Sequence, residues 1–173
     1  MNFRDLTAAD IDVRIQSVKA NKGAVLLLYK NARVDMAILD ETVGPAGWQR
    51  EHYECKGNLF CRVGINVDGS WIWKSDCGTE SNTEAEKGEA SDSFKRACFN
   101  WGIGRELYTA PFIWVPAEKL NLTDNGAKCF DKFAVERIVI EGKKITAMSI
   151  INTSKKTEKG NPVRVFTMFP EVS

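Results

Sequence analysis

The sequence predicts an α+β fold: an antiparallel β-meander with helices packed on it, a long helix after the third meander strand, and a C-terminal β-hairpin. Two observations lead to this prediction. Segments 48–55, 59–67 and 70–76 are expected to be strands, and the short turn signals "KGN" and "DGS" separate them. Such turns favour antiparallel neighbours. The segment that follows places its apolar residues at helical spacing instead.

The composition is that of one globular domain, which we expect to span residues 1–173. Apolar residues make up 43% and charged residues 27% of the chain, and the net charge is +1. A ligand that is a polyanion would therefore need cations gathered on one surface. The longest apolar run, Ala24 to Tyr29, is too short for a membrane span, and the start lacks a signal-peptide core. We expect a cytosolic protein without a membrane partner.

The first element predicted along the chain is a short capped helix. Thr7 and Asp10 have the spacing of a capping box, and Ile11, Ile15 and Val18 follow at helical spacing. We therefore expect an amphipathic helix at the N-terminus.

A buried strand and a second helix come next. The run "GAVLLLY" is short and apolar, which indicates a strand. Asn31 is a good N-cap, and Val34, Ile38 and Leu39 then lie on one side of a helix. The glycines and proline of "GPAG" end that helix before the meander begins.

The long helix is predicted from the stretch "EKGEASDSFKRACFNWGIGRELY". Thr83 and Glu86 have capping-box spacing, and Gly102 and Gly104 are expected to end the helix. The apolar positions share one face: Ala90, Phe94, Ala97 and Trp101. Beyond the helix, "FIWV" is expected to be extended, "FAVERIVIEGKKITAMSIIN" to form a hairpin turning at "EGKK", and "VRVFTMF" to form a last strand.

The polar face of the long helix carries the main candidate for binding. Lys95 and Arg96 point away from the apolar stripe, and Phe99 lies between them. Cations beside an aromatic ring suit single-stranded nucleic acid, because the charges contact phosphates and the ring stacks on a base. Two structural interpretations stay open: the cations could complement the helix dipole, or Arg96 could pair with Asp92 at i,i+4.

Other chemistries find little support in the sequence. The five cysteines are scattered without a CxxC pair, and His52 is the single histidine. A disulfide framework or a zinc site is therefore not expected. Glu54 and Lys56 have the spacing of a metal-dependent nuclease motif, but three-residue patterns are common by chance. No GxxxxGK[ST] loop is present to hold the phosphates of ATP.

The residues "ARVDMAILDETVGPAGWQ", three strands, and then "EKGEASDSFKRACFNWGIGRELY" resemble the annealing domain of the Rad-fifty-two superfamily. The likeness runs from about Ile11 to Tyr108 and is greatest to phage and prophage recombinases of the Redβ type. The resemblance implies a sheet crossed by a long helix, assembly into rings or helical filaments, and a basic groove for single-stranded DNA.

The family's site residues carry over position by position. Its "KRA" cations fall on Lys95 and Arg96, the arginine of its "IxxR" pattern falls on Arg14, and another basic position falls on Arg33. Two departures are present. Phe99 stands where eukaryotic members have a third cation, and Leu59 stands where a basic residue precedes the "FCRVG" strand, so a second, outer DNA path is not implied.

We therefore expect a homo-oligomer that binds single-stranded DNA and anneals complementary strands without ATP, in recombination and repair. It would be no enzyme and would need no cofactor, metal or catalytic residue. Its DNA contacts would be Arg14, Arg33, Lys95, Arg96, Phe99 and Arg105. A recombination exonuclease or a host single-strand-binding protein is a candidate partner, in the cytosol of a bacterium carrying the phage or prophage. The alternatives are a metal-dependent nuclease and a protein that coats single strands passively.

Overall fold

The computed structural model describes residues 1–79 and 85–169. These residues form helices and mostly antiparallel strands, so the predicted α+β class is confirmed. The chain divides into two compact units: unit 1 comprises Met1–Asp5 and Asn31–Arg105, and unit 2 comprises Leu6–Lys30 and Glu106–Ser173. That the chain acts as one domain stays a prediction.

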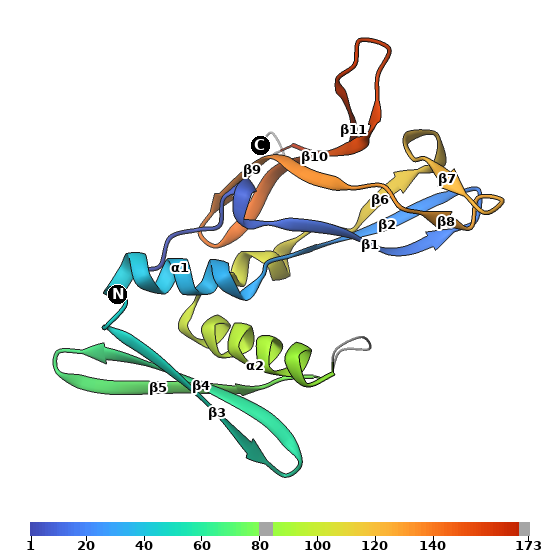
Figure 1. Ribbon diagram of the computed structural model, residues 1–173. Helices are drawn as coiled ribbons and strands as arrows, with labels where there is room; N and C mark the ends of the chain where they lie inside the picture. Colours follow the sequence, from blue (N-terminus) through green and yellow to red (C-terminus); the bar gives the residue numbers. More distant parts are fainter. Residues whose placement is uncertain (80–84, 170–173) are drawn as a thin grey trace. The chain divides into compact units, whose positions relative to one another are not determined.

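Unit 1 contains a three-stranded antiparallel sheet and two helices (Figure 1). The strands are β3 (Trp48–Cys55), β4 (Asn58–Val67) and β5 (Ser70–Cys77), with β4 in the centre. Two tight turns join them, and both use left-handed backbone: φ is 55° at Lys56 and 74° at Gly57, and 51° at Asp68 and 86° at Gly69. This conformation at both central positions is that of a type I′ turn, which matches the twist of paired strands.

The helices of unit 1 are α1 (Ala32–Val43) and α2 (Ala85–Trp101), and α2 packs on β4 and β5. The Asn31 side chain accepts a hydrogen bond from the Arg33 amide, so the predicted cap of α1 is confirmed. The core between α2 and the sheet is fully buried and includes Phe94, Ala97, Val63 and Ile65. The predicted capping box of Thr83 and Glu86 lies outside what the structure describes.

Helix α2 ends as its sequence predicts. Gly102 has a φ of 105° and donates to the Phe99 carbonyl at 2.9 Å, and the Ile103 amide donates to the Cys98 carbonyl at 3.2 Å. These two hydrogen bonds form a Schellman motif, which favours glycine because its left-handed conformation is costly for other residues. The segment after Trp101 is thereby turned away from the helix axis.

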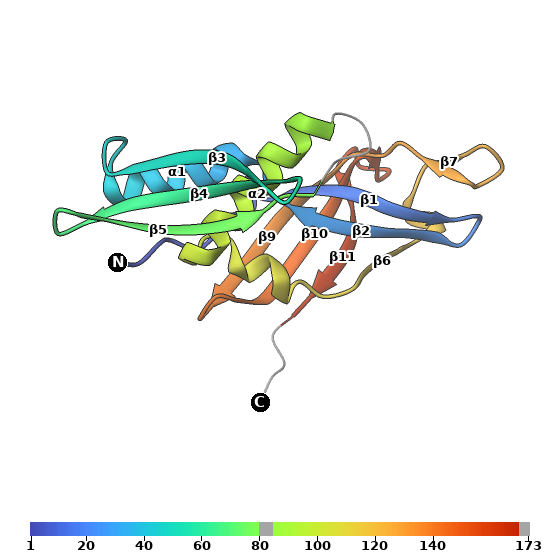
Figure 2. The same ribbon diagram turned by 90° about the horizontal axis from the view of Figure 1, so that it is seen from below.

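Unit 2 is built on a six-stranded sheet with the order β11-β10-β9-β1-β2-β6 (Figures 1 and 2). The strands are β1 (Asp12–Lys19), β2 (Gly23–Tyr29), β6 (Ile113–Pro116), β9 (Phe133–Glu141), β10 (Lys144–Lys156) and β11 (Pro162–Met168). Strands β1 and β9 pair only at Asp12–Ala134 and Val13–Phe133, so a short ladder joins the two halves of the sheet. The small pair β7 (Leu122–Thr123) and β8 (Lys128–Cys129) forms a separate ladder.

The predicted N-terminal helix is wrong. The Thr7 amide does bond to the Asp10 carboxylate at 2.8 Å, but only the 3-10 turn η1 (Ala8–Asp10) follows, and β1 begins at Asp12. Apolar residues at 11, 13 and 15 also alternate, which is the period of a strand. Pairing of β1 with the buried strand β2 provides backbone partners along its length, and this tertiary contact decides the conformation.

Unit 2 contains a polar cluster formed by Asn121, Asp131 and Asn152. Asn152 is fully buried and donates to the Asp131 carboxylate at 2.7 Å, and Asn121 bonds to the same carboxylate through its amide and its side chain, both at 2.8 Å. Burial raises the pKa of Asp131, but the hydrogen bonds from Asn121 and Asn152 together hold this pKa below its usual range. The ionised carboxylate is therefore the form that suits the folded state.

Candidate nucleic-acid interface

Lys95 and Arg96 lie on α2 on the side away from its buried stripe. Arg96 is exposed and Lys95 is half-buried. Arg96 forms an ion pair with Asp76 of β5 at 3.3 Å, whereas Asp92 accepts hydrogen bonds from the Thr79 amide and hydroxyl. The alternative interpretation, an Asp92–Arg96 pair, is therefore wrong, because strand β5 and the loop after it supply the partners of these two residues. Within the described residues, Lys95 has no hydrogen-bond or ion-pair partner.

Phe99 and Arg105 form a second group at the C-terminal end of α2. The Arg105 guanidinium lies 5.5 Å from the centre of the Phe99 ring, and it donates to the carbonyls of Phe99 and Asn100 at 2.9 Å and 3.1 Å. Phe99 is half-buried, with the Arg105 guanidinium over its ring. Arg105 thus adds charged donors to two carbonyls in the last turn of α2, of which that of Phe99 also accepts from the Gly102 amide, and it complements the helix dipole.

Lys74 of β5 is a cation at this helix end that sequence analysis missed. Its ammonium donates to the Asn100 carbonyl at 3.0 Å and lies 4.6 Å from the centre of the Trp101 ring. Strand alternation places Lys74 on the helix side of the sheet, since it pairs with the buried Val63. The alternation of side chains along β5 can be predicted from the sequence, but it identifies Lys74 only once it is known that α2 packs on this face of the sheet.

Arg33 lies at the start of α1, where it is exposed. No hydrogen-bond or ion-pair partner for its guanidinium exists among the residues that the structure describes. A cation at a helix N-terminus is opposed by the helix dipole. Its guanidinium therefore does not stabilise the start of α1.

Arg14 lies in unit 2, on β1, and contacts an aromatic residue that sequence analysis missed. Its guanidinium is 5.5 Å from the centre of the Tyr29 ring on β2, and Tyr29 is 37% exposed. The contact is diagonal, because Arg14 pairs with Leu27 and Asp12 pairs with Tyr29. A cation beside an exposed ring can hold a phosphate and leave the ring face open to a base.

The structure thus brings four of the six predicted residues together. Lys95, Arg96, Phe99 and Arg105 lie on α2 and the turn after it, Arg33 lies on the contacting helix α1, and Arg14 lies in unit 2. The donors of Arg105 and Lys74 are used by helix carbonyls. The cations with the most donors available for phosphates are therefore Arg14, Arg33 and Lys95.

The residues of the nuclease alternative do not form a metal site. Glu54 is exposed near the end of β3, and Lys56 lies in the turn that follows. His52, the single histidine, bonds to the Ala90 carbonyl at 3.0 Å. Residues 1–79 and 85–169 contain no group of three or more His, Cys, Asp or Glu that could hold a metal ion. Burial raises the pKa of the Cys61 thiol to about 11, so this cysteine is a weak ligand at neutral pH.

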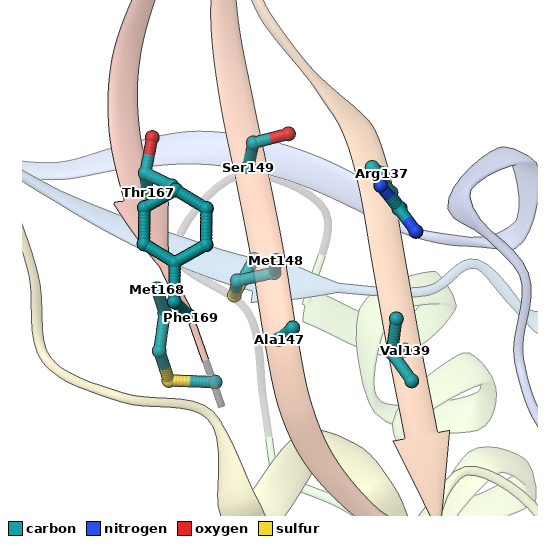
Figure 3. A pocket seen from close by; sticks show the side chains of 8 residues that line it. All are labelled: Arg137, Val139, Ala147, Met148, Ser149, Thr167, Met168 and Phe169. Carbon is teal, nitrogen blue, oxygen red and sulfur yellow. The ribbon is translucent and has the colours of Figure 1, made fainter. Parts of the chain in front are cut away.

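A shallow pocket lies on the sheet of unit 2 (Figure 3). Val139, Ala147, Met168 and Phe169 make it largely apolar, and Arg137 and Ser149 also line it. The Ser149 hydroxyl donates to Glu136 at 2.9 Å, and Glu136 is held as a carboxylate by Arg164, which lowers its pKa. A carboxylate with a lowered pKa is a weak base, so the Ser149–Glu136 hydrogen bond is better suited to holding the strands together than to activating the hydroxyl.

Comparison with known proteins decides the family. The profile of the Rad52/22 family of double-strand break repair proteins matches residues 4–125, which is more than half of the chain. The chain belongs to the Rad52/22 family. The match contains all of α1, β3, β4, β5 and α2, together with β1, β2 and β6.

Membership of the Rad52/22 family implies a part in DNA repair and recombination. Strands β9, β10 and β11 lie outside the matched residues. No curated protein and no solved structure gave a significant match to this chain. Among the helices that the structure describes, none has the length and apolar character to cross a bilayer.

Proposed function

We propose that this protein binds single-stranded DNA and anneals complementary strands without ATP during recombination and repair. The observation that carries the proposal is the Rad52/22 family match over residues 4–125. Annealing requires that phosphates be neutralised, because two single strands otherwise repel one another, while base edges stay open for pairing. Lys95, Arg96, Arg33 and Arg14 would contact phosphates, with Arg105 and Phe99 at the end of α2 in support.

The exposures of these side chains support this assignment. Arg14, Arg33 and Arg96 are exposed, and the Arg96–Asp76 pair is long at 3.3 Å with the Arg96 side chain 44% exposed. Such a surface ion pair contributes little to stability, so a phosphate can replace Asp76 at small cost. Annealing makes and breaks no covalent bond, and the proposed protein is therefore not an enzyme and needs no cofactor.

A homo-oligomer, as a ring or helical filament, belongs to the same proposal. Strands β3 and β5 are the edges of the sheet in unit 1, and among the described residues no further strand pairs with their outer sides. Unpaired edges favour association with another strand, and a head-to-tail arrangement of copies closes a ring or extends a filament. Repetition of the cations would give a chain of net charge +1 a continuous basic track.

The finer placement is also proposed: a phage or prophage recombinase of the Redβ type, acting in the bacterial cytosol beside a recombination exonuclease or a host single-strand-binding protein. The sequence motifs that resemble phage and prophage members support this placement.

Two labelled complementary oligonucleotides test the proposed function. The purified protein should bind each strand and accelerate duplex formation without nucleotide, and its mass in light scattering should exceed the 19.4 kDa of one chain. A passive coating protein would bind both strands and slow their pairing. A nuclease would shorten the strands when Mg²⁺ is added. Either result, or a strict need for ATP, would contradict annealing.

A further inference from the structure

The three-stranded sheet of unit 1 has a second face, opposite α2, which carries aromatic residues. In the central strand β4, Cys61, Val63 and Ile65 are buried on the side of the helix. Because side chains alternate along a strand, the residues between them, and the residues of β3 and β5 paired with those, lie on the second face. The aromatic face consists of Tyr53 from β3, Phe60 from β4, and Trp71 and Trp73 from β5. We propose that this face is a stacking platform for the bases of single-stranded DNA, an inference that rests on the proposed function.

The four rings form two pairs of neighbouring rings, one across β3 and β4 and one along β5. Tyr53 and Phe60 stack with their centres 5.6 Å apart and their planes 21° apart, and Trp71 and Trp73 lie 6.3 Å apart at 33°. Tyr53 is 37% exposed and Trp71 is 39% exposed. Each strand of the sheet thus contributes a ring to one surface, and large π-faces are what a base stacks on in any sequence context.

A glycine in the central strand holds one of these rings flat. A Cβ atom at Gly64 would lie 2.9 Å from three consecutive atoms of the Trp73 ring, so the ring lies face-on against the Gly64 backbone. Glycine in the interior of a strand is unfavourable and often marks a close approach. Gly64 therefore lowers the stability of the strand but leaves room for the indole of Trp73 to lie parallel to the sheet.

Arg62 adds a cation to this face, and the Glu51 carboxylate holds its guanidinium in place. Its guanidinium lies 4.6 Å from the centre of the Trp73 ring, and its Nε and one terminal nitrogen donate to the Glu51 carboxylate at 2.9 Å and 2.6 Å. The other terminal nitrogen has no partner among the described residues, and the side chain is 44% exposed. This nitrogen can donate to a base carbonyl or to a phosphate oxygen.

The charge of the face matches bases better than it matches a phosphate backbone. Glu51 and Arg62 neutralise each other, so binding here would come from stacking on uncharged rings and not from contacts to phosphates. The aromatic face thus suits the bases of a strand.

The size of the face argues against a second copy as its occupant. Strands of eight residues, such as β3 and β5, give a face of about 27 Å by 14 Å, or roughly 400 Å², from the spacing of residues and strands. A stable interface buries about 800 Å² on each partner. A surface of this size suits a few stacked bases.

Two oligonucleotides with the same phosphates separate stacking from charge: oligothymidine and an abasic oligomer of equal length. The unaltered protein should bind oligothymidine more tightly in fluorescence anisotropy. Trp71→Ala and Tyr53→Ala should each weaken oligothymidine binding by about 5- to 150-fold, the range for loss of one stacked base. Neither variant should change abasic binding or the salt dependence.

Ile72→Ala is the matched control, because Ile72 is 45% exposed on the same strand but points to the opposite face. It should keep the preference for oligothymidine, and melting curves should show that all variants fold. Failure of the unaltered protein to bind either oligonucleotide would overturn the proposed function together with this inference. Equal affinity of the unaltered protein for both, or ring variants that keep the preference, would overturn the platform alone. Ring variants that change the oligomer mass but keep the preference would assign the face to another copy of the chain.

Discussion

The guanidinium of Arg105 lies over the ring of Phe99, 5.5 Å from its centre, and donates a 2.9 Å hydrogen bond to the carbonyl of the same residue. One arginine therefore fixes both the side chain and the backbone at the end of α2. Arg105 thus has a structural role at the helix end in addition to the DNA contact proposed for it.

Arg105→Ala should destabilise unit 1 by about 1–2 kcal/mol, because the helix carbonyls lose two charge-assisted hydrogen bonds and the ring loses a cation–π contact. Chemical denaturation followed by circular dichroism measures this loss. Arg33→Ala is the control, since the Arg33 guanidinium has no such contact in the described residues, and it should leave stability nearly unchanged. Equal stability of the two variants would contradict the capping role.

Replacement of Lys95 and Arg96 by alanine should weaken single-strand binding for all sequences alike. Each lost phosphate contact should reduce the slope of log affinity against log salt by about 0.7 for a single strand. The fold should survive, because the exposed Arg96–Asp76 pair is worth at most about 1 kcal/mol. Salt-titrated fluorescence anisotropy, with melting curves of the same samples, measures both effects.

Asp76→Asn is the control for that double variant. It releases Arg96 from its ion pair at 3.3 Å, so single-strand affinity should stay equal or rise. A folded double variant with unaltered affinity and slope would show that the two cations only complement the helix.

Gly64→Ala should destabilise the sheet of unit 1 by about 1–3 kcal/mol, the usual cost of overpacking. The added methyl would come within 2.9 Å of the Trp73 ring, so the indole must leave its place against the strand. Tryptophan fluorescence should change along with the unfolding midpoint. An unchanged spectrum in Gly64→Ala would contradict the flat position of Trp73.

Acid should weaken unit 2 through Asp131, whose pKa is lowered by the hydrogen bonds from Asn121 and Asn152 despite the opposing effect of burial. A folded pKa below the unfolded value of about 3.9 gives stability that is present above that pH and is lost as the pH falls through the folded pKa. The free energy of unfolding should therefore be level near neutral pH and fall below about pH 4.

Asp131→Asn removes this titration and should flatten the acid part of the stability curve, as measured by urea denaturation at a series of pH values. Glu136→Gln is the comparison, because the pKa of Glu136 is lowered by Arg164 and Ser149 on an exposed surface. Its effect should be smaller, since solvent screens exposed pairs. An Asp131→Asn curve that parallels the unaltered protein would contradict the role of this carboxylate.

Local signals were sufficient for much of unit 1. The turns at Lys56–Gly57 and Asp68–Gly69, the cap at Asn31 and the glycine at 102 each act within a few residues. Because their energetics are local, the bounds of β3, β4 and β5 differ from the predicted segments by at most one residue.

Long-range pairing was beyond these signals. Ile11 and Ile15 fit a helix and a strand equally well, and only the backbone partners offered by β2 select the strand. The acid nearest to Arg96 in the sequence pattern was Asp92, but β5 brings Asp76 to it from 20 residues away. Lys74 and Tyr29 became candidates only when neighbouring strands placed them beside α2 and Arg14.

By itself, the sequence determined the α+β class, the helix–turn motifs and the family to which the chain belongs, because these depend on short-range spacing and on residue types in order. The tertiary structure alone decided which cations keep their donors for a ligand. It also gathered Tyr53, Phe60, Trp71 and Trp73 on one face of a sheet. The physical reason is that hydrogen bonds, ion pairs and stacking act over a few ångströms in space, whereas their partners here lie many residues apart in the chain.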